Sequence, residues 1–178
     1  MDAQYTPAPA RSEAEKLPGG LTATAARRYA HPHDARSFFL PPPRRRSVIA
    51  IFACVHNAGR SQMAAAFFNA LASPAKARAI SAGTDPGPRV HPEVVEVMRE
   101  AGIDVSAARP QKLTAELAAR AQLLVTMGCG DACPIVPGLR RDDWPLRDPK
   151  GETLERVRAI RDEIHARVQA LIVAEGLA

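Results

Sequence analysis

The sequence contains few aromatic residues, which make up 4% of its 178 residues. So few aromatic side chains offer little surface on which nucleic-acid bases could stack. A basic domain is missing as well, because residues 47–178 hold sixteen basic and fifteen acidic residues. The net charge of +5 comes mostly from residues 1–46, which hold eight basic and four acidic residues. The domain lacks both features of a nucleic-acid-binding surface, so we expect no nucleic acid as a partner.

Long apolar segments and an even number of cysteines are also missing. No apolar run approaches the roughly 20 residues that cross a bilayer, and the longest, over residues 48–55, has the length of a strand. No apolar segment of the signal-peptide type follows the basic residues near the start. The three cysteines cannot form a fully paired disulfide framework and indicate reactive or metal-bound thiols in a reducing compartment. We therefore expect a cytoplasmic protein without a membrane partner.

Composition divides the chain after residue 46. Residues 1–46 hold seven of the sixteen prolines, end in three prolines and three arginines, and show no sustained periodicity. This composition is typical of a disordered extension, which either has no function of its own or contacts an anionic partner through its arginines. Residues 47–178 are predicted to form one domain.

Within that domain, segments with the pattern of buried strands alternate with segments of helical periodicity. Pro92 suits the first turn of a helix, and Gly102 suits the position just beyond its end. This order predicts an α/β domain with a four-stranded, mostly parallel sheet flanked by helices. Ligands of such sheets bind beyond the carboxyl ends of the strands. The predicted strands cover residues 47–53, 78–82, 123–127 and 140–144, and the predicted helices cover residues 61–71, 92–101, 114–121 and 152–175.

The loop after the first predicted strand carries the most informative motif, in which five residues separate Cys54 from Arg60. Backbone N–H groups of such a strand-to-helix loop converge on an anion, and the helix N-terminus adds a favourable potential. Arg60 can bind two oxygens of a tetrahedral oxyanion, and the same field favours the thiolate form of Cys54. The alternative is a buried structural cysteine with Arg60 in a surface ion pair. The predicted substrate-binding residues are Val55, His56, Asn57, Ala58, Gly59, Arg60 and Ser61.

Individual residues of this loop have more specific interpretations. We expect Gly59 to relieve the tight turn and Ser61 to cap the helix that follows. Asn57 tolerates a positive φ and is expected to brace its neighbours through side-chain hydrogen bonds. His56 either supports the thiolate or points to water, and we favour the second interpretation.

A second element of chemistry is Asp148, which is followed by Pro149. Attack on a bound oxyanion expels an oxygen that needs a proton, and a carboxylic acid close to the anion can supply it. Pro149 would fix the local chain direction. An Asp-Pro pair alone indicates only a turn, but together with the anion-binding loop it makes Asp148 the candidate general acid.

The other two cysteines, Cys129 and Cys133, lie in a glycine-containing segment after the third predicted strand. Cysteines four residues apart cannot pair comfortably on a regular helix, whereas an irregular loop lets them approach. A thiol pair beside a reactive thiol suggests a disulfide relay, since Cys54 and Cys129 both follow strands at the same sheet edge. The alternatives are structural cysteines or a zinc site. Zinc would also need Cys54 and His56 and would forfeit the anion loop, so no bound metal is expected.

Together these motifs resemble those of arsenate reductases built on the low-molecular-weight protein tyrosine phosphatase fold. The resemblance covers about residues 47–175, and the segment around Cys129 and Cys133 is similar to the actinobacterial type in particular. It therefore implies a low-molecular-weight tyrosine phosphatase-like architecture for the domain. The residues that carry it are Val55 to Ala64 after Cys54, Ser81 to Thr84, Met127 to Pro134, and Asp142 to Trp144 before Asp148-Pro149.

The resemblance implies reduction of arsenate to arsenite, for arsenic detoxification, through an arseno-adduct on Cys54 with Asp148 as the acid. It implies no bound cofactor but an external thiol reductant. In thioredoxin-linked members, Cys129 would attack the adduct and Cys133 would complete a second disulfide. In thiol-transferase members, mycothiol attacks the adduct and mycoredoxin completes the cycle. The actinobacterial motifs favour thiol transfer, whereas the pair of cysteines favours the relay.

The alternative function is hydrolysis of phosphomonoesters through a phosphocysteine, as in low-molecular-weight protein tyrosine phosphatases. Phosphatases of this type usually carry proline where this chain has Gln62. They also carry aromatic residues where this chain has Lys150 and Gly151. Both differences favour the reductase.

Overall fold

The computed structural model describes residues 47–130 and 133–178. The predicted disordered extension, residues 1–46, lies outside the described residues. Each predicted strand and helix of residues 47–178 is present with small changes at the ends, except that the helix predicted over residues 114–121 is reduced to one turn. The elements are β1 (Val48–Cys54), α1 (Arg60–Leu71), β2 (Ala77–Gly83), α2 (Pro92–Glu100), α3 (Ala115–Ala118), β3 (Leu123–Thr126), β4 (Arg140–Asp143) and α4 (Leu154–Ala174).

The four strands form one sheet in the order β2-β1-β3-β4, and every neighbouring pair is parallel. The prediction of a four-stranded, mostly parallel sheet is thus confirmed. The strand order changes direction at β1, between β2 and β3, which is where ligands bind in open α/β sheets. Cys54 is the last residue of β1 rather than the first residue after it. Cys129 follows β3 by three positions, so both cysteines lie at the same edge of the sheet.

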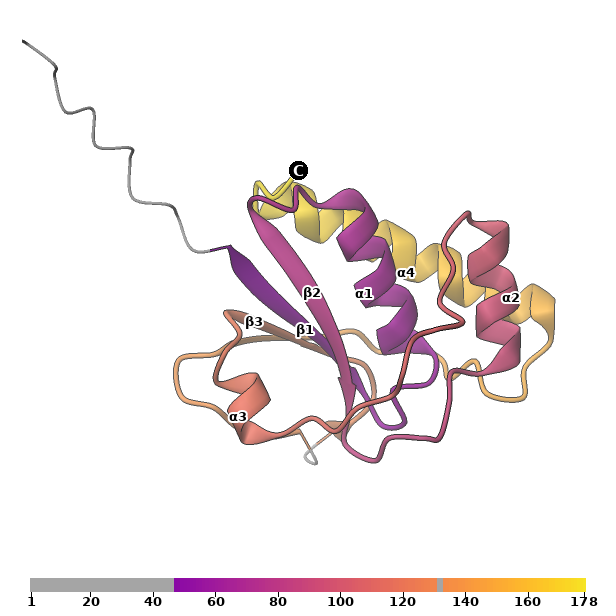
Figure 1. Ribbon diagram of the computed structural model, residues 1–178, viewed down its shortest axis with the longest axis horizontal. Helices are drawn as coiled ribbons and strands as arrows, with labels where there is room; N and C mark the ends of the chain where they lie inside the picture. Colours follow the sequence, from indigo (N-terminus) through magenta and orange to yellow (C-terminus); the bar gives the residue numbers. More distant parts are fainter. Residues whose placement is uncertain (1–46, 131–132) are drawn as a thin grey trace, which may run out of the picture. The chain divides into compact units, whose positions relative to one another are not determined.

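Alternating residues of the strands build two separate hydrophobic clusters, one on each face of the sheet. Phe52 and Cys54 of β1 belong to the larger cluster, which also contains the apolar residues of α1, α2 and α4. Ile51 and Ala53 belong to the smaller cluster, which contains Ala118 of α3. Figure 1 shows the same division, with α1, α2 and α4 on one side of the strands and α3 on the other.

Two predicted elements differ from the observed ones. The helix predicted over residues 114–121 forms only the single turn of α3. After it, the N–H groups of Arg120 and Ala121 bond to carbonyls three residues back, so the α-helix does not continue. Thr114 caps this turn by accepting a hydrogen bond from Leu117 N at 3.1 Å. The edge strand β4 is exposed at all four residues, so it lacks the buried apolar pattern of the other strands. No helix among the described residues combines the length and the apolar character that a bilayer crossing needs.

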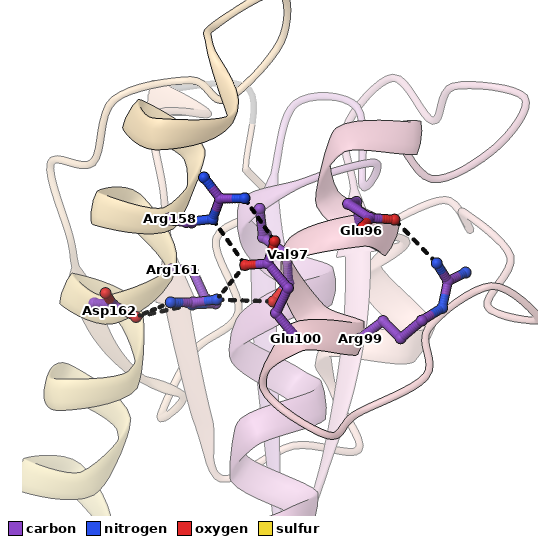
Figure 2. A network of polar contacts seen from close by, with 7 residues as sticks. All are labelled: Glu96, Val97, Arg99, Glu100, Arg158, Arg161 and Asp162. Carbon is purple, nitrogen blue, oxygen red and sulfur yellow. Dashed lines mark hydrogen bonds and ion pairs between the residues drawn. The ribbon is translucent and has the colours of Figure 1, made fainter.

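Helices α2 and α4 are joined by charged side chains, which Figure 2 shows from close by. Glu100, the last residue of α2, accepts hydrogen bonds from Arg158 Nε at 2.8 Å and Arg158 Nη2 at 2.6 Å. Arg161 contacts the same carboxylate at 3.3 Å and donates to Val97 O at 2.9 Å. The hydrogen bonds from Arg158 lower the pKa of Glu100, against the opposing effect of desolvation, and the charges of Arg158 and Arg161 add to this lowering.

The lowered pKa of Glu100 predicts a pH-dependent contribution to stability. A carboxyl group with a lower pKa in the folded state stabilises the protein above its unfolded-state pKa, which is about 4.3 for glutamate, and loses that effect as the pH falls. We therefore expect Glu100→Gln to lower the melting temperature modestly at pH 7. The difference from the wild type should shrink as the pH falls below the unfolded-state pKa and vanish only below the lowered pKa of Glu100 in the folded protein. Thermal unfolding followed by circular dichroism measures this difference. Glu96→Gln is the matched control, because Glu96 pairs only with Arg99 on its own helix, and a pH-independent difference would contradict the assignment.

Candidate active site

The loop between β1 and α1 presents its carbonyl groups to the surrounding chain. The segment that follows β2 runs along the loop and donates backbone hydrogen bonds to it. The carbonyl of Gly59 accepts from the first turns of α1, at Gln62 N (3.0 Å) and Met63 N (3.1 Å). The bonds from the segment after β2 run from Thr84 N to Cys54 O (3.2 Å), Asp85 N to Val55 O (2.9 Å), Gly87 N to His56 O (2.9 Å) and His91 N to Ala58 O (2.9 Å).

The N–H groups of the same loop have no such partners. Within residues 47–130 and 133–178, no backbone N–H of residues 55–61 donates a hydrogen bond to another protein group. Because the carbonyls are bound on the outer side, the N–H groups remain available on the other side, at the N-terminus of α1. A loop with this arrangement forms a concave anion-binding nest, and the helix N-terminus strengthens its positive potential.

Cys54 lies at the start of this loop and is buried, with 3% of its surface exposed. Its Sγ is 3.0 Å from Ser61 Oγ. Ser61 Oγ also accepts a hydrogen bond from Asn57 Nδ2 at 2.8 Å, which leaves the hydroxyl proton free to be donated to the sulfur. The prediction that Ser61 caps α1 is wrong, because Gly59 occupies the N-cap position and no side chain caps the helix. Ser61 lies inside the first turn, where its hydroxyl group reaches the thiol.

Asn57 braces the loop, as predicted. It has a φ of 49° and is fully buried. Its Oδ1 accepts a hydrogen bond from Gln111 N at 2.9 Å. Gln62 Nε2 donates to Asn57 O at 3.0 Å and lies 3.3 Å from Asn57 Oδ1. Gln62 and Gln111 were not predicted as site residues, and the only signal in the sequence was that Gln62 stands where phosphatases have proline.

Arg60 and Asp148 are brought together at the other end of the loop. Arg60 Nη2 donates to Asp148 Oδ2 at 2.7 Å, and Arg60 Nη1 donates to Leu146 O at 3.0 Å. The third nitrogen, Arg60 Nε, is buried and has no hydrogen-bond partner. The guanidinium is therefore held in place by the Asp148 segment, while the Nε–H group remains for an additional acceptor. Arg60 does form an ion pair, as the alternative interpretation expected, but its side chain is buried and only its partner Asp148 is exposed.

Asp148 itself is accessible, with 46% of its side chain exposed, and Lys150 N donates to its Oδ1 at 3.1 Å. Pro149 packs directly against the loop, since a Cβ atom added at Gly59 would lie 2.6 Å from Pro149 Cγ. Gly59 is thus needed for the close approach of Pro149 as well as for the turn. This approach brings the candidate acid to the anion-binding loop.

His56 differs from its favoured interpretation. It is half-buried rather than fully exposed to water, and its Nδ1 lies 3.1 Å from the backbone oxygen of Asp85. The imidazole therefore ties the loop to the segment after β2. The backbone oxygens of Val55 and Ala58, two further predicted binding residues, accept hydrogen bonds from Asp85 N and His91 N.

Cys129 and Cys133 form a disulfide with a Cα–Cα distance of 6.0 Å. Both residues are buried, and they pack in the smaller hydrophobic cluster on the α3 side of the sheet. Cys54 remains a free thiol and belongs to the larger cluster on the other side. Zinc is bound by cysteine thiolates, and the disulfide leaves neither Cys129 nor Cys133 as a thiolate. The pairing of these two residues agrees with the disulfide that a relay would produce.

Comparison with known proteins gives a consistent set of matches. Residues 49–177 match the family described as low molecular weight phosphotyrosine protein phosphatase. A putative arsenate reductase from Halobacterium salinarum is 39% identical over 66% of this chain and 85% of its own length. A glutaredoxin arsenate reductase from Synechocystis is 34% identical over 68% of this chain and 94% of its own length. The structure of a thioredoxin-dependent arsenate reductase from Corynebacterium glutamicum is 37% identical, with a TM-score of 0.63 over 72% of this chain. This chain covers 61% of the corynebacterial chain.

Proposed function

Because the chain belongs to the low molecular weight phosphotyrosine protein phosphatase family, we propose that it is the family's arsenate-reducing type of enzyme and converts arsenate to arsenite. The observation that carries this proposal is the loop of residues 54–61, which begins at a buried free thiol and whose N–H groups have no partner among the described residues. Relatives named arsenate reductase, 34% and 39% identical to this chain, support the choice of substrate.

In the proposed first step, the loop N–H groups and Arg60 Nε bind the oxygens of arsenate. The thiolate of Cys54 attacks arsenic, a sulfur–arsenic bond forms, and one oxygen departs. Asp148 supplies the proton that this oxygen needs, so that it leaves as water. Asp148 is suited to the role because Arg60 holds its carboxyl group beside the oxyanion, while its exposed side allows proton exchange with solvent. Ser61 stabilises the thiolate before attack through its contact with Sγ.

In the proposed second step, a thiol attacks the sulfur of Cys54. The sulfur–arsenic bond breaks, its electron pair stays with arsenic, and arsenite leaves. If the attacking thiol is Cys129, the product is a Cys54–Cys129 disulfide, which Cys133 then attacks to give a Cys129–Cys133 disulfide and a free Cys54. The observed disulfide and free thiol correspond to this end state, which favours the relay over direct thiol transfer.

The cycle then requires an external thiol reductant. One relative is named a glutaredoxin arsenate reductase and one structural neighbour a thioredoxin-dependent arsenate reductase. A thioredoxin-like dithiol protein is the proposed donor, because it can reduce an intramolecular disulfide by exchange. Mycothiol with mycoredoxin is the other candidate and would act on the adduct directly.

Phosphomonoester hydrolysis is the second candidate function, since the family includes phosphatases. The position of Gln62 favours the reductase. Its side chain makes two contacts with Asn57 that a proline could not make, so the local structure of the loop depends on it. Lys150 and Gly151, which follow the acid, offer no aromatic surface for a phosphotyrosine ring.

Purified protein incubated with arsenate distinguishes these functions. One reaction contains thioredoxin, thioredoxin reductase and NADPH, and a second contains mycothiol with mycoredoxin; arsenite is measured in both. Hydrolysis of p-nitrophenyl phosphate is measured in parallel. We expect arsenite with at least one donor. Efficient ester hydrolysis without arsenite from either donor would instead identify a phosphatase.

Arg60→Lys tests the assignment of the oxyanion-binding arginine. Lysine keeps the charge but has one donor group, which cannot bind Leu146 O, Asp148 and an oxyanion in the geometry of the planar guanidinium. We expect kcat/KM for arsenate to fall on the order of 10²-fold or more, as for other lost oxyanion contacts. Arg158→Lys on α4 is the control, because Arg158 pairs with Glu100 and not with the loop. An unimpaired Arg60→Lys enzyme would show that Arg60 does not bind the substrate.

A further inference from the structure

Gly128 lies between β3 and the first cysteine of the disulfide, at a position where a side chain would meet Arg60. A Cβ atom added at Gly128 would lie 2.9 Å from Arg60 Nη1 and 3.8 Å from Arg60 Cζ. The distance to Nη1 is too short for a real contact, so a side chain at this position would displace the guanidinium. Gly128 also has a φ of 77°, a conformation that glycine adopts without strain.

The guanidinium has little freedom to yield. Nη1 is bonded to Leu146 O and Nη2 to Asp148 Oδ2, and the side chain is buried. Because the group is planar and rigid, a push on Nη1 also turns Nη2 and Nε. Nε is the donor that has no partner in the protein and that is proposed to bind the oxyanion. Crowding at Gly128 would therefore change both the oxyanion contact and the contact with the acid.

We propose that Gly128 is a positioning residue for the oxyanion site: it leaves the space in which Arg60 takes its binding orientation. This inference rests on the proposed oxyanion role of Arg60. Because Gly128 directly precedes Cys129, it also places the backbone of the redox-active segment in contact with the substrate-binding arginine.

The test compares Gly128→Ala with Gly130→Ala, and inorganic phosphate is the probe. Both glycines have positive φ values, but a Cβ at Gly130 would meet nothing within 4 Å, so the two variants share the backbone strain and differ in the contact with Arg60. Calorimetry on the full-length disulfide-bonded protein measures phosphate affinity. We expect Gly128→Ala to weaken binding about tenfold, less than the roughly hundredfold effect of a lost oxyanion donor. Gly130→Ala should change it less than about twofold, as for other substitutions without contacts.

Two further variants separate positioning from general destabilisation. Asparagine tolerates a positive φ, so Gly128→Asn keeps the steric contact with less backbone strain and should show the same loss of affinity. In an Arg60→Lys background, Gly128→Ala should cause little further loss, because the two residues act through one contact. In turnover, Gly128→Ala should raise KM for arsenate more than it lowers kcat. Equal losses for Gly128→Ala and Gly130→Ala, or unchanged phosphate binding by Gly128→Asn, would overturn the proposal. Phosphate binding by the wild type without arsenate reduction would instead overturn the proposed function alone.

Discussion

Replacing Cys54 with serine should abolish arsenite production while the protein still folds and binds phosphate. Serine has nearly the same shape, and its hydroxyl group can keep the contact with Ser61 that the thiol makes at 3.0 Å. The loop N–H groups do not depend on the side chain at Cys54, so the anion site should remain. The chemistry should fail because a serine hydroxyl stays protonated near neutral pH, whereas a thiol in a positive potential ionises and attacks.

Three measurements separate this result from unfolding. Arsenite release under multiple turnover should fall to the background level, the circular dichroism spectrum should match the wild type, and phosphate should still bind in calorimetry. A serine enzyme that retains near-wild-type arsenite production would show that another group is the nucleophile. A serine enzyme that loses phosphate binding would show that the thiol itself holds the anion.

The parts of the fold and site that the sequence predicted are those that depend on residues close to one another in the sequence. The apolar run of β1, the helical spacing before Gly102 and the tight loop after Cys54 are local patterns, and each appears where it was expected. The brace at Asn57 could also be predicted, since a positive φ in a tight loop favours this residue type. Most of the structure of the anion-binding loop could therefore be predicted from its local sequence.

Contacts between distant segments could not be predicted in the same way. Arg60 is bonded to Leu146 and Asp148, which are 86 and 88 positions away, and the packing of Pro149 on Gly59 joins the same segments. The sequence predicted an acid near the loop but did not indicate that Arg60 would hold it. Ser61 shows the related error, because its residue type suits a cap while its actual partner, Cys54, comes from the preceding strand.

The positions of the three cysteines were predicted only in part. Parallel strands placed Cys54 and Cys129 at one sheet edge, and the structure agrees. The pattern did not indicate that Cys129 and Cys133 pack in the cluster opposite to that of Cys54. The strand alternation ends at Gly128, whose φ of 77° redirects the chain before Cys129. For a relay, Cys129 must therefore leave the smaller cluster in its reduced form to reach the sulfur of Cys54.

The relay predicts an arrest at a different stage for each cysteine variant. Fully reduced wild-type protein should reduce one equivalent of arsenate without added thiol, because Cys129 supplies the attacking sulfur and Cys133 completes the disulfide that the structure contains. Cys129→Ser should stop at the arseno-adduct on Cys54 and release no arsenite. Cys133→Ser should release one equivalent and stop at a Cys54–Cys129 disulfide. Mass spectrometry of the protein after a single turnover, with arsenite measured in the same sample, identifies each state.

The same variants decide between the two electron donors. If mycothiol attacks the adduct, neither Cys129 nor Cys133 is needed, and the double variant Cys129→Ser, Cys133→Ser should stay fully active with mycothiol and mycoredoxin. If the relay operates, the double variant should be inactive with thioredoxin, since no disulfide is left for the dithiol to reduce. A pair that only fills the smaller cluster would not be needed for the chemical step, so its replacement by serines would leave turnover of the folded protein intact. Full activity with mycothiol would remove the relay from the mechanism and leave the pair with a structural role.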